Sequence, residues 1–212
     1  MKRFLFYFLN LTWGLPMNIV GFIVALVLLC VGKRPKRWGD CFYFEVGKNW
    51  GGLNLGIFFI TDRYAGASTR NHEHGHAIQN CFLGVLMPFI VGIPSVIRYW
   101  LREFKTQKSK YIYSTIIAFC IGLIGCSLIF IPLTIFEIVG RLLIVYAVII
   151  CGWLVEKEIP QYKLNKYVDY DAVWYEGQAT RLGTKYVEEL WKIKNIKRSI
   201  KILCKYVWIY II

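Results

Sequence analysis

Apolar residues are gathered into blocks along the chain, and short basic or mixed segments separate the blocks. Residues 4–31 form the first block, residues 82–100 the second, and residues 111–133 and 134–155 the last two. A helix needs about 20 predominantly apolar residues to cross the hydrocarbon core of a bilayer. The pattern therefore predicts a mainly α membrane protein, a single integral-membrane domain with about three to four transmembrane or re-entrant helices.

The first two blocks contain residues that bend or end helices. Pro16 favours a kink in a retained N-terminal span over residues 1–32, and a helical hairpin bent at the same residue with both ends on one side is the alternative. The second block is predicted to be broken or re-entrant because of Gly84, Pro88, Gly92 and Pro94. The last two blocks predict a two-span hairpin over residues 111–155, turning at Pro132.

Residues 41–110 begin with a different pattern. Aromatic and β-branched residues from Cys41 to Thr61 flank a glycine-rich stretch at residues 47–52, which predicts a short β-hairpin. Open strand edges cannot face lipid, so we expect this hairpin at or outside the membrane interface. Polar residues follow, with Ser68, Thr69 or Asn71 able to cap a helix that runs from about Arg70 to Gln79.

The last segment, residues 156–212, returns to mixed polarity. Its final part predicts a basic amphipathic helix lying on an anionic membrane surface, because lysines alternate with apolar residues at helical spacing: Trp191, Ile193, Ile196, Ile200, Leu203 and Val207.

Charge and cysteine content narrow the function classes. The net charge of +13 is concentrated at residues 33–37 and 98–110, beside the apolar blocks, which indicates cytoplasmic loops in contact with anionic lipid. No basic domain with a reading motif remains for nucleic acid. The 7 cysteines form no Cys-x-x-Cys pair and lie mostly in apolar runs, so they are predicted to be packing residues.

The chemistry of the chain centres on residues 72–76, His-Glu-His-Gly-His, which contain all 3 histidines. On a helix, His72 and His76 lie on one face and can bind one metal ion. Glu73 beside them completes the H-E-x-x-H arrangement, in which two histidines hold Zn²⁺ and the glutamate acts as a general base toward water. His74 points elsewhere and is predicted to be a supporting or surface residue.

A catalytic zinc site needs a third protein ligand, and no histidine remains. The acidic candidates are Asp169, Asp171 and Glu176, which lie after the spans and before the basic tail. Asp169 and Asp171 also fit the start of a helix, where acids stabilise the positive end. Glu176 falls inside the predicted helix, and the small residues Gly177 and Ala179 would let that helix approach the metal helix closely.

At these residues the chain resembles a known family. The pairing of His-Glu-x-x-His with a glutamate on a later helix is similar to the gluzincin metallopeptidases, and its setting among apolar spans resembles integral-membrane members such as the CAAX-processing proteases. Residues 72–79, with 83–84 and 92–95, also resemble a group of small bacterial membrane proteins that carry His-Glu-Tyr-Gly-His. The resemblance covers roughly residues 50–100 and 165–185.

The resemblance implies that His72, His76 and Glu176 bind zinc and that Glu73 is the base, with His74, Gln79 and Thr180 as candidates for a supporting layer. It departs from the family in two ways. The 100-residue separation between His76 and Glu176 is long for gluzincins, and Thr180 stands where an aspartate often supports the first histidine. Site-2 proteases use an aspartate as third ligand, which keeps Asp169 and Asp171 as alternatives.

Zinc peptidases also often align the substrate backbone on an edge strand beside the metal helix, and residues 57–60 are the candidate strand. A purely structural hairpin is the alternative and explains these residues equally well. An oxyanion donor could come from Tyr167, Tyr170 or Tyr175, and the sequence gives no basis for choosing among them.

The expected function is that of a membrane-embedded zinc metalloprotease that hydrolyses a membrane-associated polypeptide, in a bacterial inner membrane with its site near the cytoplasmic face. The alternative is a non-catalytic scaffold or regulator with a structural or vestigial zinc site. A third possibility, a transporter, would use Glu137 and Arg141 at membrane depth, although an i,i+4 ion pair near the interface explains these two residues better. Neither the substrate nor the oligomeric state follows from the sequence.

Overall fold

The computed structural model describes residues 3–162 and 169–211, and within the last helix it describes side chains as far as Ile193, together with Asn195. The chain divides into two compact units. The first comprises residues 1–90 and 170–212, and the second comprises residues 91–169.

The first unit contains a four-stranded sheet in the order β1-β2-β4-β3, formed by β1 (Lys36–Trp38), β2 (Cys41–Glu45), β3 (Gly52–Leu55) and β4 (Phe58–Thr61). β1 and β2 are antiparallel, β2 and β4 are parallel, and β3 and β4 form a hairpin that turns at Gly56, which has a φ of 78°. The positive φ suits glycine, which has no Cβ to clash.

This sheet corrects the predicted hairpin. The strands on either side of residues 47–52 are β2 and β3, and they are not neighbours, because β4 lies between them. The loop is closed by its own contacts: Asp62 accepts from the backbone N–H of Gly51 at 3.0 Å, and Trp50 donates to the carbonyl of Val46 at 2.6 Å. Local sequence predicted strands here, but their pairing depends on contacts beyond the loop.

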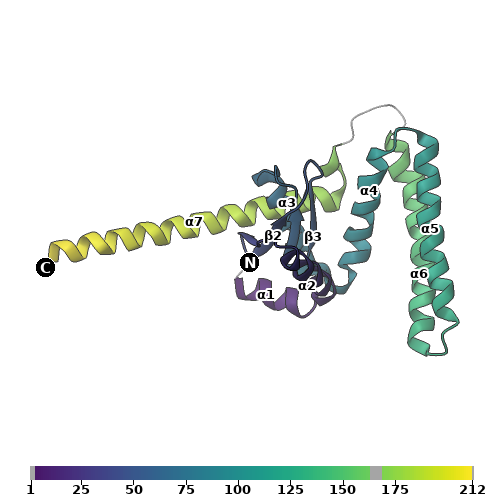
Figure 1. The fold of residues 1–212 in the computed structure, drawn as a ribbon, viewed down its shortest axis with the longest axis horizontal. Helices are drawn as coiled ribbons and strands as arrows, with labels where there is room; N and C mark the ends of the chain where they lie inside the picture. Colours follow the sequence, from purple (N-terminus) through teal and green to yellow (C-terminus); the bar gives the residue numbers. More distant parts are fainter. Residues whose placement is uncertain (1–2, 163–168, 212) are drawn as a thin grey trace. The chain divides into compact units, whose positions relative to one another are not determined.

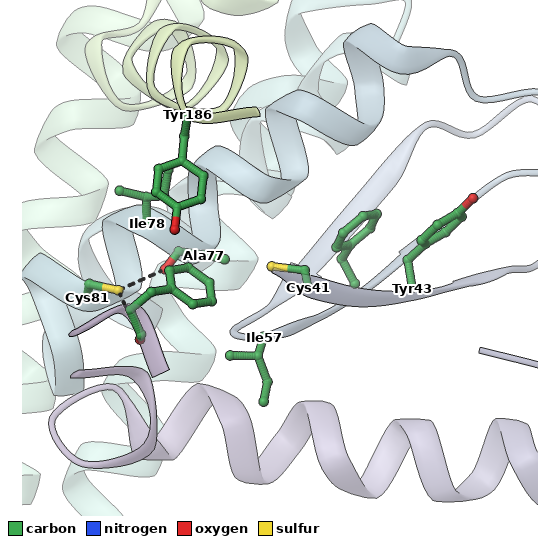
Figure 2. Close-up of a cluster of buried hydrophobic side chains, with 9 residues drawn as sticks. Cys41, Tyr43, Ile57, Ala77, Ile78, Cys81 and Tyr186 are labelled. Atoms are coloured by element: carbon green, nitrogen blue, oxygen red, sulfur yellow. Dashed lines mark hydrogen bonds between the residues drawn. The ribbon is translucent and has the colours of Figure 1, made fainter. Parts of the chain in front are cut away.

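Helices cover both faces of the sheet. The face with Tyr43 and Phe59, whose rings stack at 5.2 Å, packs on α3 (Ala67–Leu83). The core on this side, drawn in Figure 2, contains nine buried residues: Phe6, Cys41, Tyr43, Ile57, Phe59, Ala77, Ile78, Cys81 and Tyr186. The other face, with Phe58, packs on α2 (Leu15–Cys30), where Phe22 and Phe58 lie 6.4 Å apart.

α1 (Arg3–Leu11) and α2 meet at a bend of 89°. Three buried asparagines fix this corner to the rest of the unit. Asn80 of α3 donates to the side chain of Asn10 at 2.7 Å, and Asn18 donates to the carbonyl of Asn10 at 2.7 Å while its own oxygen accepts from Ile57 N–H at 2.7 Å. Buried amides stabilise a fold only when partnered, so this network ties α1, α2, α3 and the sheet together.

α3 begins at Ala67 with Gly66 as its N-cap, so none of the three predicted capping side chains is used. It ends at Gly84, whose φ of 55° suits glycine, and a 3₁₀ turn (Gly84–Leu86) and a π-helical turn (Pro88–Gly92) follow. The second apolar block is therefore broken at the glycines and prolines that the sequence indicated.

α7 (Trp174–Ile211) crosses α3 in the first unit (Figure 1) and follows a 3₁₀ turn, η5 (Tyr170–Ala172). Most side chains of the predicted amphipathic tail, those of Ile196 onward, lie outside the part of α7 whose side chains are described.

The second unit contains α4 (Ile93–Glu103) and the helical hairpin of α5 (Gln107–Ile129) and α6 (Thr134–Trp153), which lie side by side in Figure 1. The hairpin helices cross closely: a Cβ on Gly125 would lie 2.8 Å from the carbonyl oxygen of Gly140. The chain continues from α6 through a π-helical turn (Leu154–Glu158) and a 3₁₀ turn (Ile159–Tyr162).

Two described helical stretches, Gln107–Ile129 and Thr134–Gln161, are long and apolar enough to cross a membrane, and up to four are if each bent pair counts as one span. The first bent pair is α1 with α2, and α3 and α4 meet the criterion only when taken together. Arg141 donates to Glu137 at 2.5 Å within α6, so the i,i+4 ion pair predicted from the sequence is present.

Candidate metal centre

The two histidines of the motif point their Nε2 atoms at the same place. His72 and His76 are one helical turn apart on α3, and their Nε2 atoms are 3.0 Å apart with the rings perpendicular. His72 is partly buried and His76 is buried. Local helix geometry alone produces this pair, since residues at i and i+4 lie on one face.

Glu176, in the first turn of α7, supplies the third donor. Its Oε2 lies 3.2 Å from the Nε2 of His72 and 3.2 Å from that of His76, and the residue is fully buried. A tetrahedral site with Zn–N and Zn–O bonds of roughly 2.0 Å places its ligand atoms about 3.3 Å apart. The three atoms therefore form a triangle of the size that a tetrahedral zinc site requires.

Small residues allow α7 to come this close to α3. A Cβ on Gly75 would lie 1.8 Å from the carbonyl oxygen of Ala179, and one on Gly183 would lie 1.7 Å from that of Asn71. The helices thus touch through their backbones at two points. Ala179 was predicted to permit this approach, whereas Gly177 faces the carbonyl of Asp171 in η5, and Gly75 and Gly183 were missed.

Gln79 fixes the proton of His76. Its Nε2 donates to the carbonyl of Tyr175 at 2.7 Å, and a carbonyl oxygen can only accept, so Oε1 of Gln79 faces Nδ1 of His76 at 2.8 Å. Nδ1 of a neutral His76 must then carry the hydrogen, which leaves a lone pair on Nε2. This is the tautomer that metal binding through Nε2 requires.

Thr180 supports the other histidine. Its hydroxyl lies 2.8 Å from Nδ1 of His72 and accepts when that nitrogen carries the proton. Both supporting side chains named from the sequence, Gln79 and Thr180, therefore contact the histidine nitrogens that face away from the cluster. A threonine hydroxyl is neutral, so it orients the ring without the charge that an aspartate would add.

The side chain of Glu73 extends from α3 toward β3, the strand at the edge of the sheet. It is 4% exposed, and burial raises the pKa of its carboxyl, with the charge of Glu176 adding to the rise and those of His72 and His76 opposing it. A Cβ on Gly52 of β3 would lie 2.5 Å from Oε1 of Glu73. A larger residue at this position of β3 would therefore have to displace the Glu73 carboxylate. The side chain of Asn54 also donates to the backbone carbonyl of Glu73 at 2.9 Å.

His74 lies on the opposite side of α3 and takes no part in the cluster. Its ring stacks on Tyr186 at 5.1 Å and on Phe6 at 5.6 Å, and its Nε2 accepts from the backbone N–H of Asp40 at 3.3 Å. Burial lowers the pKa of His74 to about 4, so the ring is neutral. It packs α1 and α7 against α3, and it does not contact the histidines of the cluster as a supporting residue would.

Neither aspartate alternative belongs to the group of donor atoms that could hold a metal ion. Asp171 places Oδ1 3.9 Å from Nδ1 of His72, which is the nitrogen that faces Thr180. Asp169 has an exposed side chain, and its backbone carbonyl accepts from Arg98 at 2.8 Å in the second unit. Among the described residues, His72, His76 and Glu176 form the group that could hold a metal ion, with all donor atoms within 4.8 Å of one another.

The tyrosines suggested as oxyanion donors lie in different surroundings. The ring of Tyr170, in η5, is 5.9 Å from that of His72, so it stands at the edge of the cluster. Tyr175 is buried and holds Gln79 through its backbone carbonyl. Tyr167 lies outside the described residues.

Charge within the cluster holds a proton on His76. Burial alone lowers the pKa of this histidine, but its hydrogen bond to Glu176 and the charges of Glu176 and Glu73 outweigh burial and raise the pKa to about 8. Metal binding through Nε2 must displace that proton.

Comparison of the chain with protein-family models, with curated proteins and with solved structures finds no match in any of the three.

Proposed function

We propose that the protein is a zinc-dependent peptidase in which His72, His76 and Glu176 hold the metal and Glu73 is the general base. The observation that carries the proposal is the triangle of two imidazole nitrogens and one buried carboxylate oxygen, at 3.0 to 3.2 Å from one another. Two imidazoles and a carboxylate are a donor set that zinc prefers. Three protein ligands leave one position open, as catalytic zinc sites do, whereas structural sites are closed by four.

A zinc ion held there would polarise a peptide carbonyl and make water acidic near neutral pH. Glu73 then takes a proton from the water that adds to the carbonyl carbon, and it delivers that proton to the amine as the C–N bond breaks. Burial raises the pKa of Glu73 and so brings it closer to neutral pH, which suits a group that must both accept and donate.

The edge strand β3 is the element that would position a polypeptide. The candidate from the sequence was residues 57–60, and residues 58–60 of it lie in β4. β4 is paired with β2 on one side and with β3 on the other, so it cannot add another strand. The backbone carbonyl of Gly51 accepts from the N–H of Asp62, the residue that follows β4. The alternation of an antiparallel ladder then directs the peptide groups of Gly52 and Asn54 toward the open edge. These are the strand residues that touch Glu73.

The substrate on this proposal is an extended polypeptide segment, and its membrane association follows from the apolar helices of the same chain. The alternative, a scaffold with a structural or vestigial zinc site, needs neither the open coordination position nor a buried carboxylate beside the metal. The two functions differ in what Glu73 does.

The test measures metal and turnover separately on detergent-purified protein. Elemental analysis should find about one zinc per chain in the wild type and in Glu73→Gln, and loss of zinc in His76→Ala and Glu176→Gln. Hydrolysis of a quenched-fluorescent peptide library should occur in the wild type and in Asp171→Asn, and it should be lost in Glu73→Gln, His76→Ala and Glu176→Gln. Asp171→Asn is the matched control and should keep its zinc.

Three results would count against the proposal. Retention of zinc in Glu176→Gln together with its loss in Asp171→Asn would move the third ligand to η5. Equal hydrolysis by the wild type and Glu73→Gln would show that Glu73 is not the general base. A protein that binds zinc but hydrolyses no peptide would favour the scaffold function.

A further inference from the structure

One face of α2 is apolar and uncovered within the first unit. Its members recur at helical spacing and each exposes between 45% and 58% of its surface: Ile19, Phe22, Ile23, Leu26 and Val27. We call these five residues the α2 stripe. α2 contains no charged residue along its 16 positions. Contiguous apolar surface of this kind marks an interaction site in a folded protein.

The opposite face of α2 is committed to the sheet. Its buried residues are Met17, Asn18, Gly21 and Ala25, and the last three are small or polar. A Cβ on Gly21 would lie 2.2 Å from the carbonyl oxygen of Leu55, and Asn18 accepts from Ile57 N–H. The sheet therefore packs against α2 at residues 18–22, with backbone contact at Gly21.

This packing decides how α2 can meet a bilayer. A helix that crossed the membrane would carry the attached strands into the hydrocarbon, where the open edge of β3 would leave backbone groups without partners. The length of α2 agrees, since 16 residues extend only about 24 Å, short of the roughly 30 Å of the hydrocarbon core. The stripe alone can enter lipid.

The residues at the two ends of α2 also favour a helix that lies along the membrane surface. Arg34, Lys36 and Arg37 follow the helix within seven residues and are exposed, and Trp13 at its start is 45% exposed. Basic residues next to an apolar face attract anionic headgroups, and tryptophan is enriched at membrane interfaces.

We propose that α2 lies flat in one leaflet as an in-plane anchor, with the α2 stripe in the acyl region and the basic residues at anionic headgroups. The first apolar block is then neither a span nor a hairpin that penetrates the bilayer. The inference is independent of whether the metal centre is catalytic, because it depends only on how α2 packs on the sheet.

The depth of labelled residues tests the proposal in the full chain, reconstituted into phosphatidylcholine and phosphatidylglycerol vesicles. An environment-sensitive fluorophore is attached through Ile19→Cys, Ile23→Cys or Val27→Cys, one at a time. Five cysteines become serine and the buried Cys41 and Cys81 stay, because they are at most 3% exposed. The five replaced are Cys30, Cys120, Cys126, Cys151 and Cys204.

If α2 is an in-plane anchor, all three labels should emit as in an apolar medium. Nitroxides attached to the lipids should quench all three labels most strongly at the same shallow depth. A control label at Tyr64→Cys, which is 67% exposed in the loop before α3, should emit as in water. A crossing helix would instead separate the first and last labels by about 12 Å of depth.

Three outcomes would overturn the inference. A graded depth from Ile19 to Val27 would make α2 a span. Apolar emission without quenching by lipid would mean that protein, such as a second copy of the chain, covers the stripe. Aqueous emission from all three labels would leave the stripe in solvent.

Discussion

The backbone contact between Gly75 of α3 and Ala179 of α7 gives the sharpest prediction. Gly75→Ala places a Cβ 1.8 Å from the carbonyl oxygen of Ala179, where ordinary contact needs at least 3.4 Å. α3 and α7 must therefore separate by about 1.6 Å at this point. Glu176 lies three residues before Ala179 on the same helix and moves with it, so its 3.2 Å distances to the histidines increase by a similar amount.

Zinc sites tolerate changes of only about 0.2 Å in ligand distance. We therefore expect Gly75→Ala to weaken zinc binding by about 100-fold or more, the upper end of the loss seen when outer-shell partners are disturbed. Forcing extra atoms into a packed contact should also lower the free energy of unfolding by about 1 to 3 kcal/mol. Gly183→Ala, whose Cβ would lie 1.7 Å from the Asn71 carbonyl, should behave alike.

The assay is competition for zinc against a chelator of known affinity, with a thermal melt of the same detergent sample. Gly152→Ala in α6 is the control, since nothing lies within 4 Å of its added Cβ. If Gly75→Ala binds zinc and melts like the wild type, α3 and α7 do not cross at backbone contact, and the reasoning that places Glu176 fails.

Three further predictions concern the same cluster. Gln79→Leu removes the acceptor that fixes the His76 tautomer, so zinc binding measured by chelator competition should weaken by about 10- to 100-fold; an unchanged affinity would contradict the tautomer argument. His76, with a pKa of about 8, is protonated below that pH in the metal-free protein, so zinc affinity should fall by about tenfold per pH unit below 8 and level off above it. Zinc titrations across this range that show no slope would place the proton elsewhere. Gly52→Val should keep its zinc but lose peptide hydrolysis, because the added Cβ would lie 2.5 Å from the Glu73 carboxylate; Leu53→Ala, on the other face of β3, is its control, and full activity in Gly52→Val would argue against β3 beside the base.

Prediction from sequence worked best where the physics is local. Helical periodicity depends on residues within one or two turns, so the spacing of His72 and His76 on α3 and the two apolar helices α5 and α6 could be read directly. Glycine and proline also mark chain breaks locally, as at Gly84.

Prediction failed where a contact joins distant residues. The strands flanking residues 47–52 were identifiable, but β4 inserts between β2 and β3, and nothing in the local pattern specifies that order. The edge strand was accordingly misassigned to residues 57–60. Gly52 and Gly183 gave a weak signal, because a glycine marks many kinds of close approach and the sequence does not say what it approaches.

The sequence by itself determined which groups are available: two histidines and a glutamate on one helical turn, and acidic residues on a later segment. It also determined that the apolar blocks are long enough to cross a membrane. Tertiary structure decided which acid joins the histidines. Glu176 reaches them because Gly75 and Gly183 let two helices touch, while Asp169 and Asp171 lie before that crossing. Spacing along a chain fixes only neighbours within an element, and the meeting of α3 with α7, 100 residues apart at His76 and Glu176, depends on packing.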